Sequence, residues 1–113
     1  MEATRNTLVR TDFVFPLPVG LDDRHASPLL CAGIIGFRSL RVAGVESGER
    51  VRLFGFGSSA SLTIPILKSW KCEVYVVTRG PAHRDLGTSL GADWVGKEDD
   101  KPPVPLDRAI TRC

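Results

Sequence analysis

The run Arg50-Val51-Arg52-Leu53-Phe54 leads directly into the loop Gly55-Phe56-Gly57-Ser58-Ser59-Ala60, and a second apolar run, Val74-Tyr75-Val76-Val77, follows one helix length later. A strand, a glycine-rich turn, a helix and a second strand within about 30 residues are typical of the first β-α-β unit of a dinucleotide-binding sheet. The order of these segments therefore predicts an α/β protein with a parallel sheet.

The loop has the form G-x-G-x-x-A, in which each small residue has a physical role. Gly55 permits a tight turn, Gly57 lets a pyrophosphate approach the backbone, and Ala60 allows close packing of helix on strand. Ser58 and Ser59 begin the predicted helix, whose free N–H groups and positive dipole end would face that phosphate. Such loops also occur as purely structural turns, but the flanking strands favour cofactor binding by these five residues.

The end of the second predicted strand indicates which cofactor is bound. An Asp or Glu at this place normally binds the adenosine ribose hydroxyls of NAD, whereas here the chain reads Thr78-Arg79-Gly80. No carboxylate would repel a 2′-phosphate, and the guanidinium can pair with it. Thr78 and Arg79 therefore predict NADP rather than NAD. The alternative is that Arg79 is a solvated loop cation, with His83 and Arg84 either assisting it or facing water.

The segment before the glycine loop predicts a helical lead. Asp22 and Asp23 precede an apolar stretch from Ala26 to Leu40, and acids favour a helix N-terminus. One or two helices are expected here, with breaks at Gly33 and Gly36 because glycine is a poor helix former.

The helix after the glycine loop is predicted over residues 58–70. A serine is available to cap its first amides, and Leu62, Ile66 and Leu67 have the spacing of a buried face. Pro65 opposes this helix because an interior proline removes a backbone hydrogen bond and costs about 3 kcal/mol. We expect a kink, a shortened first turn or a weakened helix.

The remaining elements complete half of a larger fold. The patterns predict a strand at 73–77, a helix at 82–90 closed by Gly91, a strand at 93–95, a charged, proline-rich surface loop at 97–105 and a strand at 108–111. A six-stranded dinucleotide-binding fold needs two such halves. The 113 residues therefore predict a partial Rossmann fold, a doubly wound parallel sheet of three to four strands with an N-terminal helical lead.

The composition limits which binding partners and which cellular location are expected. The net charge of +2 arises from nearly balanced acids and bases, so neither nucleic acid nor a membrane surface is an expected partner. No run of about 18 apolar residues indicates a membrane span. Three irregularly spaced cysteines do not indicate a disulfide framework, which favours reduced thiols and a cytoplasmic location. A small-molecule ligand is expected.

Several segments together resemble the zinc-type medium-chain alcohol dehydrogenases over residues 12–111. They are Pro28-Leu29-Leu30-Cys31-Ala32-Gly33, the following Ile34-Ile35-Gly36-Phe37-Arg38-Ser39-Leu40, the glycine loop, and Leu90-Gly91-Ala92-Asp93. On its own, a lone cysteine with apolar neighbours is usually a small buried hydrophobe. The resemblance instead implies that Cys31 is a catalytic zinc ligand in the full-length family fold. It further implies that residues 1–40 are the end of the catalytic domain with a hinge helix, and that 41–113 are the first half of the NAD(P)-binding domain.

The resemblance implies hydride transfer between NADP(H) and an alcohol or aldehyde. The other zinc ligands of the family lie in a barrel-like domain that this chain lacks, so the isolated chain is expected to be an inactive, truncated part of such an oxidoreductase. Two alternatives are a non-catalytic nucleotide-binding or interaction module, associating with itself or a complementary chain, and a remnant without function. A zinc-free quinone reductase is a nearer rival, which Cys31 disfavours. Pro65 and Lys71, the latter in place of a helix-ending glycine, depart from the family pattern.

Overall fold

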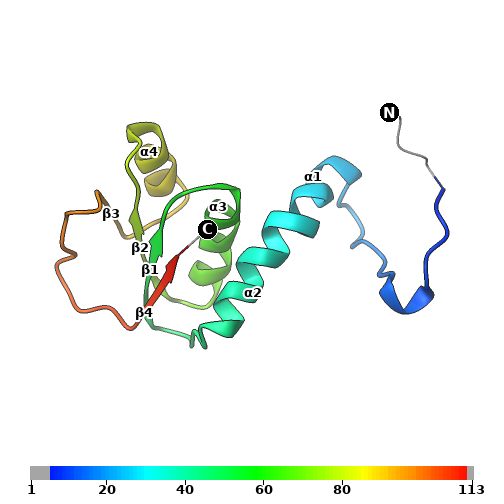
Figure 1. Ribbon diagram of the computed structural model, residues 1–113, viewed down its shortest axis with the longest axis horizontal. Helices are drawn as coiled ribbons and strands as arrows, with labels where there is room; N and C mark the ends of the chain where they lie inside the picture. The colour runs from blue at the N-terminus through cyan, green and yellow to red at the C-terminus, as the bar shows by residue number, and fades with distance from the viewer. Residues whose placement is uncertain (1–5, 112–113) are drawn as a thin grey trace.

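The computed structural model describes residues 6–111 of the chain (Figure 1). Its elements in chain order are η1 (Thr11–Phe13), α1 (Asp23–Pro28), the π-helical turn η2 (Leu29–Gly33), α2 (Ile34–Val42), β1 (Arg50–Phe54), α3 (Ser58–Ser69), β2 (Glu73–Val77), α4 (Pro81–Ser89), β3 (Trp94–Gly96) and β4 (Arg108–Thr111).

The four strands form one parallel sheet in the order β3-β2-β1-β4. At its centre, Leu53 of β1 pairs with Val76 of β2 on one side and Ile110 of β4 on the other. Parallel neighbours need crossover connections, which α3 supplies between β1 and β2 and α4 supplies between β2 and β3. The predicted α/β class, a partial Rossmann fold of three to four strands, is confirmed.

The core lies between the sheet and its helices. Alternate strand residues point to this side because successive side chains of a strand face opposite ways. Its buried members are Leu40 of α2, Val51 and Leu53 of β1, Phe56, the α3 residues Ala60, Ile64 and Leu67, then Cys72, Val74 and Val76 of β2, and Ile110 of β4. The segment from β3 to β4 contains no helix in the described chain, which agrees with the surface loop predicted at 97–105.

The helical lead differs from its prediction. From Asp23 to Val42 the chain is helical throughout, as α1, η2 and α2 follow one another directly, so the breaks predicted at Gly33 and Gly36 are wrong. A glycine costs a helix only about 1 kcal/mol, which tertiary packing can outweigh. At Gly36 the missing side chain permits a close crossing of α2 over α3, because a Cβ there would lie 2.5 Å from Cγ2 of Thr63.

The start of the lead agrees with its acidic sequence. Asp22 is the N-cap of α1, and its carboxylate accepts a hydrogen bond from the backbone N–H of His25 at 2.9 Å. That bond, together with the hydrogen bond from the His25 ring, holds the pKa of Asp22 below its usual value. The acids therefore begin this helix by capping it.

Helix α3 ends within one residue of its predicted end, but its first turn and its N-cap differ from the predictions. It keeps its first turn and continues through Pro65, so the expected shortening did not occur. The predicted serine cap is wrong, because the N-cap is Gly57 and no side chain caps the helix. Ser61 instead turns back to donate from Oγ to the carbonyl of Ser58 at 2.8 Å.

The buried face of α3 is also displaced from the predicted one. Leu67 is buried as expected, but Leu62 and Ile66 are only half-buried. Both line a 480 Å³ apolar groove between α3 and the helical lead. The buried residues of α3 are instead Ala60, Thr63, Ile64 and Leu67, of which Thr63 lies at the crossing with α2.

Residues 6–20 extend away from the body of the molecule (Figure 1). Their apolar side chains are largely exposed, including Phe15 at 81%. No strand forms between Phe13 and Pro18. Among the described residues, no helix combines the length and the apolar character needed to cross a membrane.

Candidate functional site

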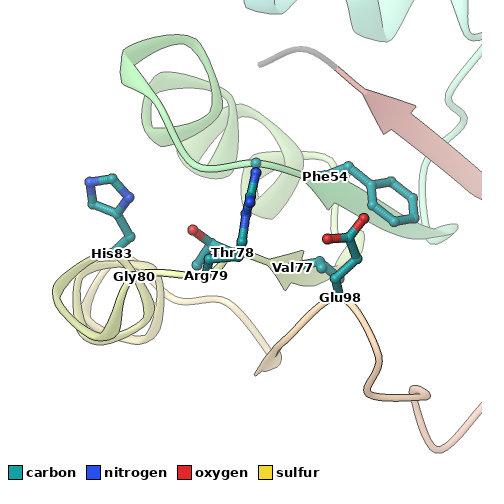
Figure 2. Close-up of a pocket in the computed structure, with 8 residues that line it drawn as sticks. Phe54, Val77, Thr78, Arg79, Gly80, His83 and Glu98 are labelled. Carbon is teal, nitrogen blue, oxygen red and sulfur yellow. The ribbon is translucent and has the colours of Figure 1, made fainter.

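A cleft of about 530 Å³ opens at the carboxyl ends of β1 and β2 (Figure 2). The ends of parallel strands meet at one edge of a sheet, so the loop after β1 faces the loop after β2. A backbone hydrogen bond from Gly55 N to Val77 O, at 2.8 Å, ties the two loops together. The cleft is lined by Phe54, Gly55, Val77, Thr78, Arg79, Gly80, His83 and Glu98.

The glycine loop leaves its backbone accessible. Gly55 has φ of +85°, a conformation that strongly favours glycine, and both Gly55 and Gly57 are exposed. Phe56 instead turns inward and is 6% exposed, while Ala60 is completely buried. The loop therefore anchors one side chain in the core and presents bare backbone to the cleft.

The start of α3 adds unpaired amides beside this backbone. The first intrahelical bond runs from Ser61 N to Gly57 O at 3.0 Å, so the N–H groups of Ser58, Ser59 and Ala60 precede the helical ladder. A second cavity of about 280 Å³ lies here, lined by Phe56, Gly57, Ser58, Ser61, His83 and Leu86. His83 lines both cavities, which places a concave surface beside the helix start as well as beside the strand ends.

The end of β2 contributes a cation. Thr78 is buried, whereas Arg79 is exposed and its side chain rises toward the glycine loop (Figure 2). Among residues 6–111, Arg79 has no ion pair and no side-chain hydrogen bond. Arg84 donates from Nη1 to the carbonyl of Arg79 at 3.2 Å and so supports its backbone, and the His83 ring points outward from α4. The cleft thus offers an unpaired guanidinium.

Glu98 is a lining residue that sequence reasoning missed. Its carboxylate points from the loop after β3 toward the ring of Phe54 (Figure 2). The charged segment 97–105 was assigned to the surface, and no local signal distinguishes Glu98 from Asp99 and Asp100. Its place follows from the return path of the loop, which depends on the assembled sheet.

Cys31 lies in η2 and is exposed, so its interpretation as a small buried hydrophobe is wrong. It does not line the cleft at the strand ends. Within the described part of the chain, no three His, Cys, Asp or Glu residues gather where they could hold a metal ion. A zinc site needs three or four protein ligands, so the described residues do not fit zinc by themselves. The role of Cys31 as a ligand stays a prediction.

The geometry combines features that suit an extended anionic ligand. Free amides at a helix start bind phosphate, and the guanidinium can pair with a second anion nearby. The residues singled out in the sequence, Gly55 through Ala60 with Thr78 and Arg79, all lie around this one edge of the sheet. Cys31 alone lies elsewhere.

Known proteins are similar to this chain in sequence and in fold. The chain is 45% identical over 104 residues to a probable alcohol dehydrogenase of Mycobacterium tuberculosis, covering 92% of the chain and 30% of that protein. A cinnamyl alcohol dehydrogenase from Sorghum bicolor superimposes with a TM-score of 0.67 at 31% identity, covering 77% of the chain and 25% of that structure. The protein CAD from Helicobacter pylori, solved in complex with NADP(H), gives 0.63 at 29% identity, covering 74% and 24%.

No family model matches the chain. The chain spans about 30% of the length of the mycobacterial relative, so the similarity concerns one segment of these proteins. Within that segment, the sequence match, the parallel sheet and the glycine loop all indicate the same family. The chain therefore belongs, over this segment, to the zinc-type medium-chain alcohol dehydrogenase family.

Proposed function

We propose that this chain is the part of an NADP-dependent alcohol dehydrogenase that grips the adenosine half of the cofactor. Residues 41–113 would form the first half of the nucleotide-binding domain, and residues 1–40 the end of the catalytic domain with its hinge helix. The observation that carries this proposal is the unpaired guanidinium of Arg79 in a cleft at the strand ends, beside the uncapped start of α3.

The residues of the cleft fit NADP. The amides of Ser58, Ser59 and Ala60 would receive the pyrophosphate, because they have no intrahelical partner. Arg79 would pair with the 2′-phosphate, and Thr78 takes the place of the acid that would repel it. Glu98 lines the same cleft but makes no ion pair with Arg79. The NADP(H) complex of the Helicobacter pylori relative supports this choice of cofactor.

Affinity for the two nicotinamide cofactors tests the proposal. Charge-assisted hydrogen bonds contribute about 1.5–3 kcal/mol, so the chain should bind NADP about 10- to 100-fold more tightly than NAD in calorimetric titrations. Arg79→Ala should remove this preference and leave NAD binding unchanged. Arg41→Ala, which removes an arginine of α2 outside the cleft, is the matched control. Equal affinity of the wild-type chain for NADP and NAD would refute the proposed specificity.

The reaction would be hydride exchange between the nicotinamide of NADP(H) and an alcohol or aldehyde. The described residues would hold and orient the cofactor, and Cys31 would contribute one thiolate to a zinc site whose other ligands this chain does not bring together. We therefore expect no NADPH-dependent aldehyde reduction by the 113-residue polypeptide. NADPH consumption that scales with the concentration of the purified chain would contradict this expectation. The proposed full-length dehydrogenase would act in the cytoplasm.

The alternative of an interaction module has one specific observation in its favour. The helical lead exposes several large apolar side chains, namely Leu30, Ile34, Ile35, Phe37 and Val42. Exposed patches of this kind mark protein contacts. A second copy of the chain is the occupant we test, by light scattering over a range of concentrations. Association without cofactor binding would favour the module, whereas a stable monomer that binds neither NADP nor NAD would indicate a remnant without function.

A further inference from the structure

We propose that the N-terminal arm of one copy of this chain docks into the apolar groove of a second copy, and that the exchange is reciprocal. The arm is residues 13–18, Phe-Val-Phe-Pro-Leu-Pro. The groove, of about 480 Å³, is lined by Leu29, Ile34 and Phe37 of the helical lead and by Leu62, Pro65 and Ile66 of α3. It shares no lining residue with the cleft at the strand ends, so this inference goes beyond cofactor binding and does not depend on it.

The groove presents apolar surface with a fixed aromatic ring. Phe37 packs edge-to-face against Trp70, with the ring centroids 6.1 Å apart, and this contact holds the Phe37 ring in place. Ile34 and Phe37 nevertheless remain exposed to solvent. Grooves lined by aromatic side chains bind proline-containing segments in an extended conformation. The groove is therefore suited to a segment of that kind.

The arm is such a segment. Phe15 and Leu17 each precede a proline, which restricts both to extended backbone, and Val14 is extended with φ of −116° and ψ of 131°. An extended segment loses little conformational freedom on docking, and its prolines bring no N–H group that would be buried without a partner. The Phe13 ring already contacts the Arg10 guanidinium, 5.3 Å from the ring centroid, so we expect Phe15 to be the main anchor.

The direction of the arm favours a second copy over the same chain as its binding partner. The arm lies beyond α1, away from α3 (Figure 1). A bond from Leu21 N to Pro18 O at 3.2 Å and the capping of α1 by Asp22 fix the direction in which the arm leaves the helical lead. Docking into its own groove would require the chain to reverse at this turn, whereas docking into a partner would leave the turn intact. Exchange of the same element in both directions gives a closed two-fold pair.

A reciprocal exchange buries enough surface for a specific dimer. Phe13 and Phe15 are 72% and 81% exposed. The four phenylalanines of a pair, with the groove surface that they cover, would bury on the order of 1,200 Å². Specific interfaces bury about 1,200–2,000 Å², and permanent ones are larger. We therefore expect a reversible dimer.

The charges beside the groove are complementary to the arm. The apolar surface continues past Phe37 into a second hollow, which Arg38 and Arg41 also line. Neither arginine has an ion pair among residues 6–111. Asp12 directly precedes the arm, and its carboxylate is held only in an exposed pair with Arg10 at 2.7 Å. Such a pair contributes little, so this carboxylate can turn to the arginines of a partner.

Sedimentation equilibrium of the full chain, from micromolar to millimolar concentration, tests the inference. Phe15→Asp removes the anchor of the arm, and Ile34→Asp places a charge at an exposed position in the groove. Each variant should dimerise at least about 100-fold more weakly than the wild type, because its homodimer loses both contacts. Leu8→Asp and Ile35→Asp are the matched controls, because both side chains are exposed and lie outside the arm and the groove. Both controls should dimerise as the wild type does.

Mixing the two disrupted variants tests the exchange itself. Phe15→Asp keeps an intact groove and Ile34→Asp keeps an intact arm, so an equimolar mixture should form a heterodimer with one contact, more tightly than either variant pairs with itself. A mixture that does not associate would overturn the inference, because the arm would then bind its own groove or no groove at all. Unchanged circular dichroism of the variants confirms that each is folded.

Three further results would also overturn the inference. They are a wild type that stays monomeric at every concentration, a Phe15→Asp variant that dimerises normally, and an equal loss from Ile35→Asp, which would indicate a general contact between exposed helical leads. None of these measurements involves a nucleotide, so their failure would leave the cofactor proposal intact.

Discussion

At the scale of single residues, Lys71 stands out because it adopts a glycine-like conformation. It has φ of +59°, the only described non-glycine residue with positive φ. It follows α3 and closes that helix, with Lys71 N bonded to Lys68 O at 3.0 Å and Cys72 N to Leu67 O at 2.9 Å. This pair of bonds is the Schellman motif, which also ends α2 at Gly44 and α4 at Gly91. One of three equivalent helix ends therefore carries a strained residue.

Replacing Lys71 by glycine should stabilise the protein. The left-handed conformation costs a residue with a Cβ about 1–2 kcal/mol, and glycine avoids this cost while losing some entropy on folding. We expect the free energy of unfolding to rise by about 1 kcal/mol in urea denaturation. Lys71→Ala is the control, because it removes the side chain and keeps the Cβ. An equal gain in both variants would show that backbone strain is not the cause.

At the scale of elements, α3 is the helix on which the cleft depends, and it contains an interior proline. Pro65 is exposed and cannot donate the bond that the carbonyl of Ser61 would receive. The helix still spans Ser58 to Ser69 because its other face is fully buried against the sheet, as at Ile64 and Leu67. Most helical stability comes from such packing rather than from propensity.

The variant Pro65→Ala should therefore be more stable than the wild type. The alanine restores the backbone bond, a gain of about 3 kcal/mol in host helices, reduced by about 1 kcal/mol because the unfolded chain gains freedom. A net gain of about 2 kcal/mol should be visible in thermal unfolding. Pro81→Ala is the matched control, because Pro81 occupies the first turn of α4, where no intrahelical bond is lost. A gain from Pro81→Ala as large as that from Pro65→Ala would refute this explanation.

At the scale of the whole molecule, the sheet has two different ends. The carboxyl ends of the strands form the cleft, while the opposite ends are joined by polar contacts. There Arg108 donates to Glu49 from Nε at 3.2 Å, and Arg50 N donates to Asp107 at 2.8 Å. These bonds connect residues 59 and 57 positions apart and so hold β4 against β1. Among the described residues, no ion pair joins the strands at the cleft end.

The Glu49 contacts predict a loss of stability in acid. The backbone N–H of Glu46 and then the Arg108 side chain hold the pKa of Glu49 below its ordinary value of 4.5. A lowered pKa in the folded state means that the unfolded state binds more protons, so stability falls as the pH drops below about 4.5. Glu49→Gln should show a shallower loss across this range in urea denaturation. Asp99→Asn is the control, because the Asp99 carboxylate lies in a loop and has no hydrogen bond in the described chain. This variant should keep the wild-type dependence of stability on pH. The same dependence in the wild type and both variants would show that the Glu49 contacts do not cause the loss in acid.

The whole molecule is also more extended than its length requires. Its radius of gyration is 16.2 Å, against about 13 Å for a compact domain of 100 residues. Residues 6–20 and the exposed side of the helical lead account for this shape (Figure 1). The sheet itself is compact, so the proposed cofactor site does not depend on where these residues lie.

Most of the fold could be predicted because its signals are local. The runs at Arg50–Phe54 and Glu73–Val77 are short, apolar and bounded by turn residues, and both became strands with the predicted bounds. The helical continuity at Gly36 could not be predicted, because it depends on how closely α2 crosses α3. The position of Arg79 at the cleft could likewise be predicted, because it directly follows a predicted strand. The position of Glu98 could not be predicted, because it depends on a loop that returns across the assembled sheet.

We propose that the edge of the sheet between the glycine loop and Arg79 binds a 2′-phosphorylated dinucleotide. A backbone amide NMR titration of the chain with NADP tests this proposal. We expect saturable chemical-shift changes concentrated in residues 55–60 and 78–80, and a smaller change at Arg79 when NAD replaces NADP. Shifts confined to the helical lead, or no saturable shift at all, would contradict it.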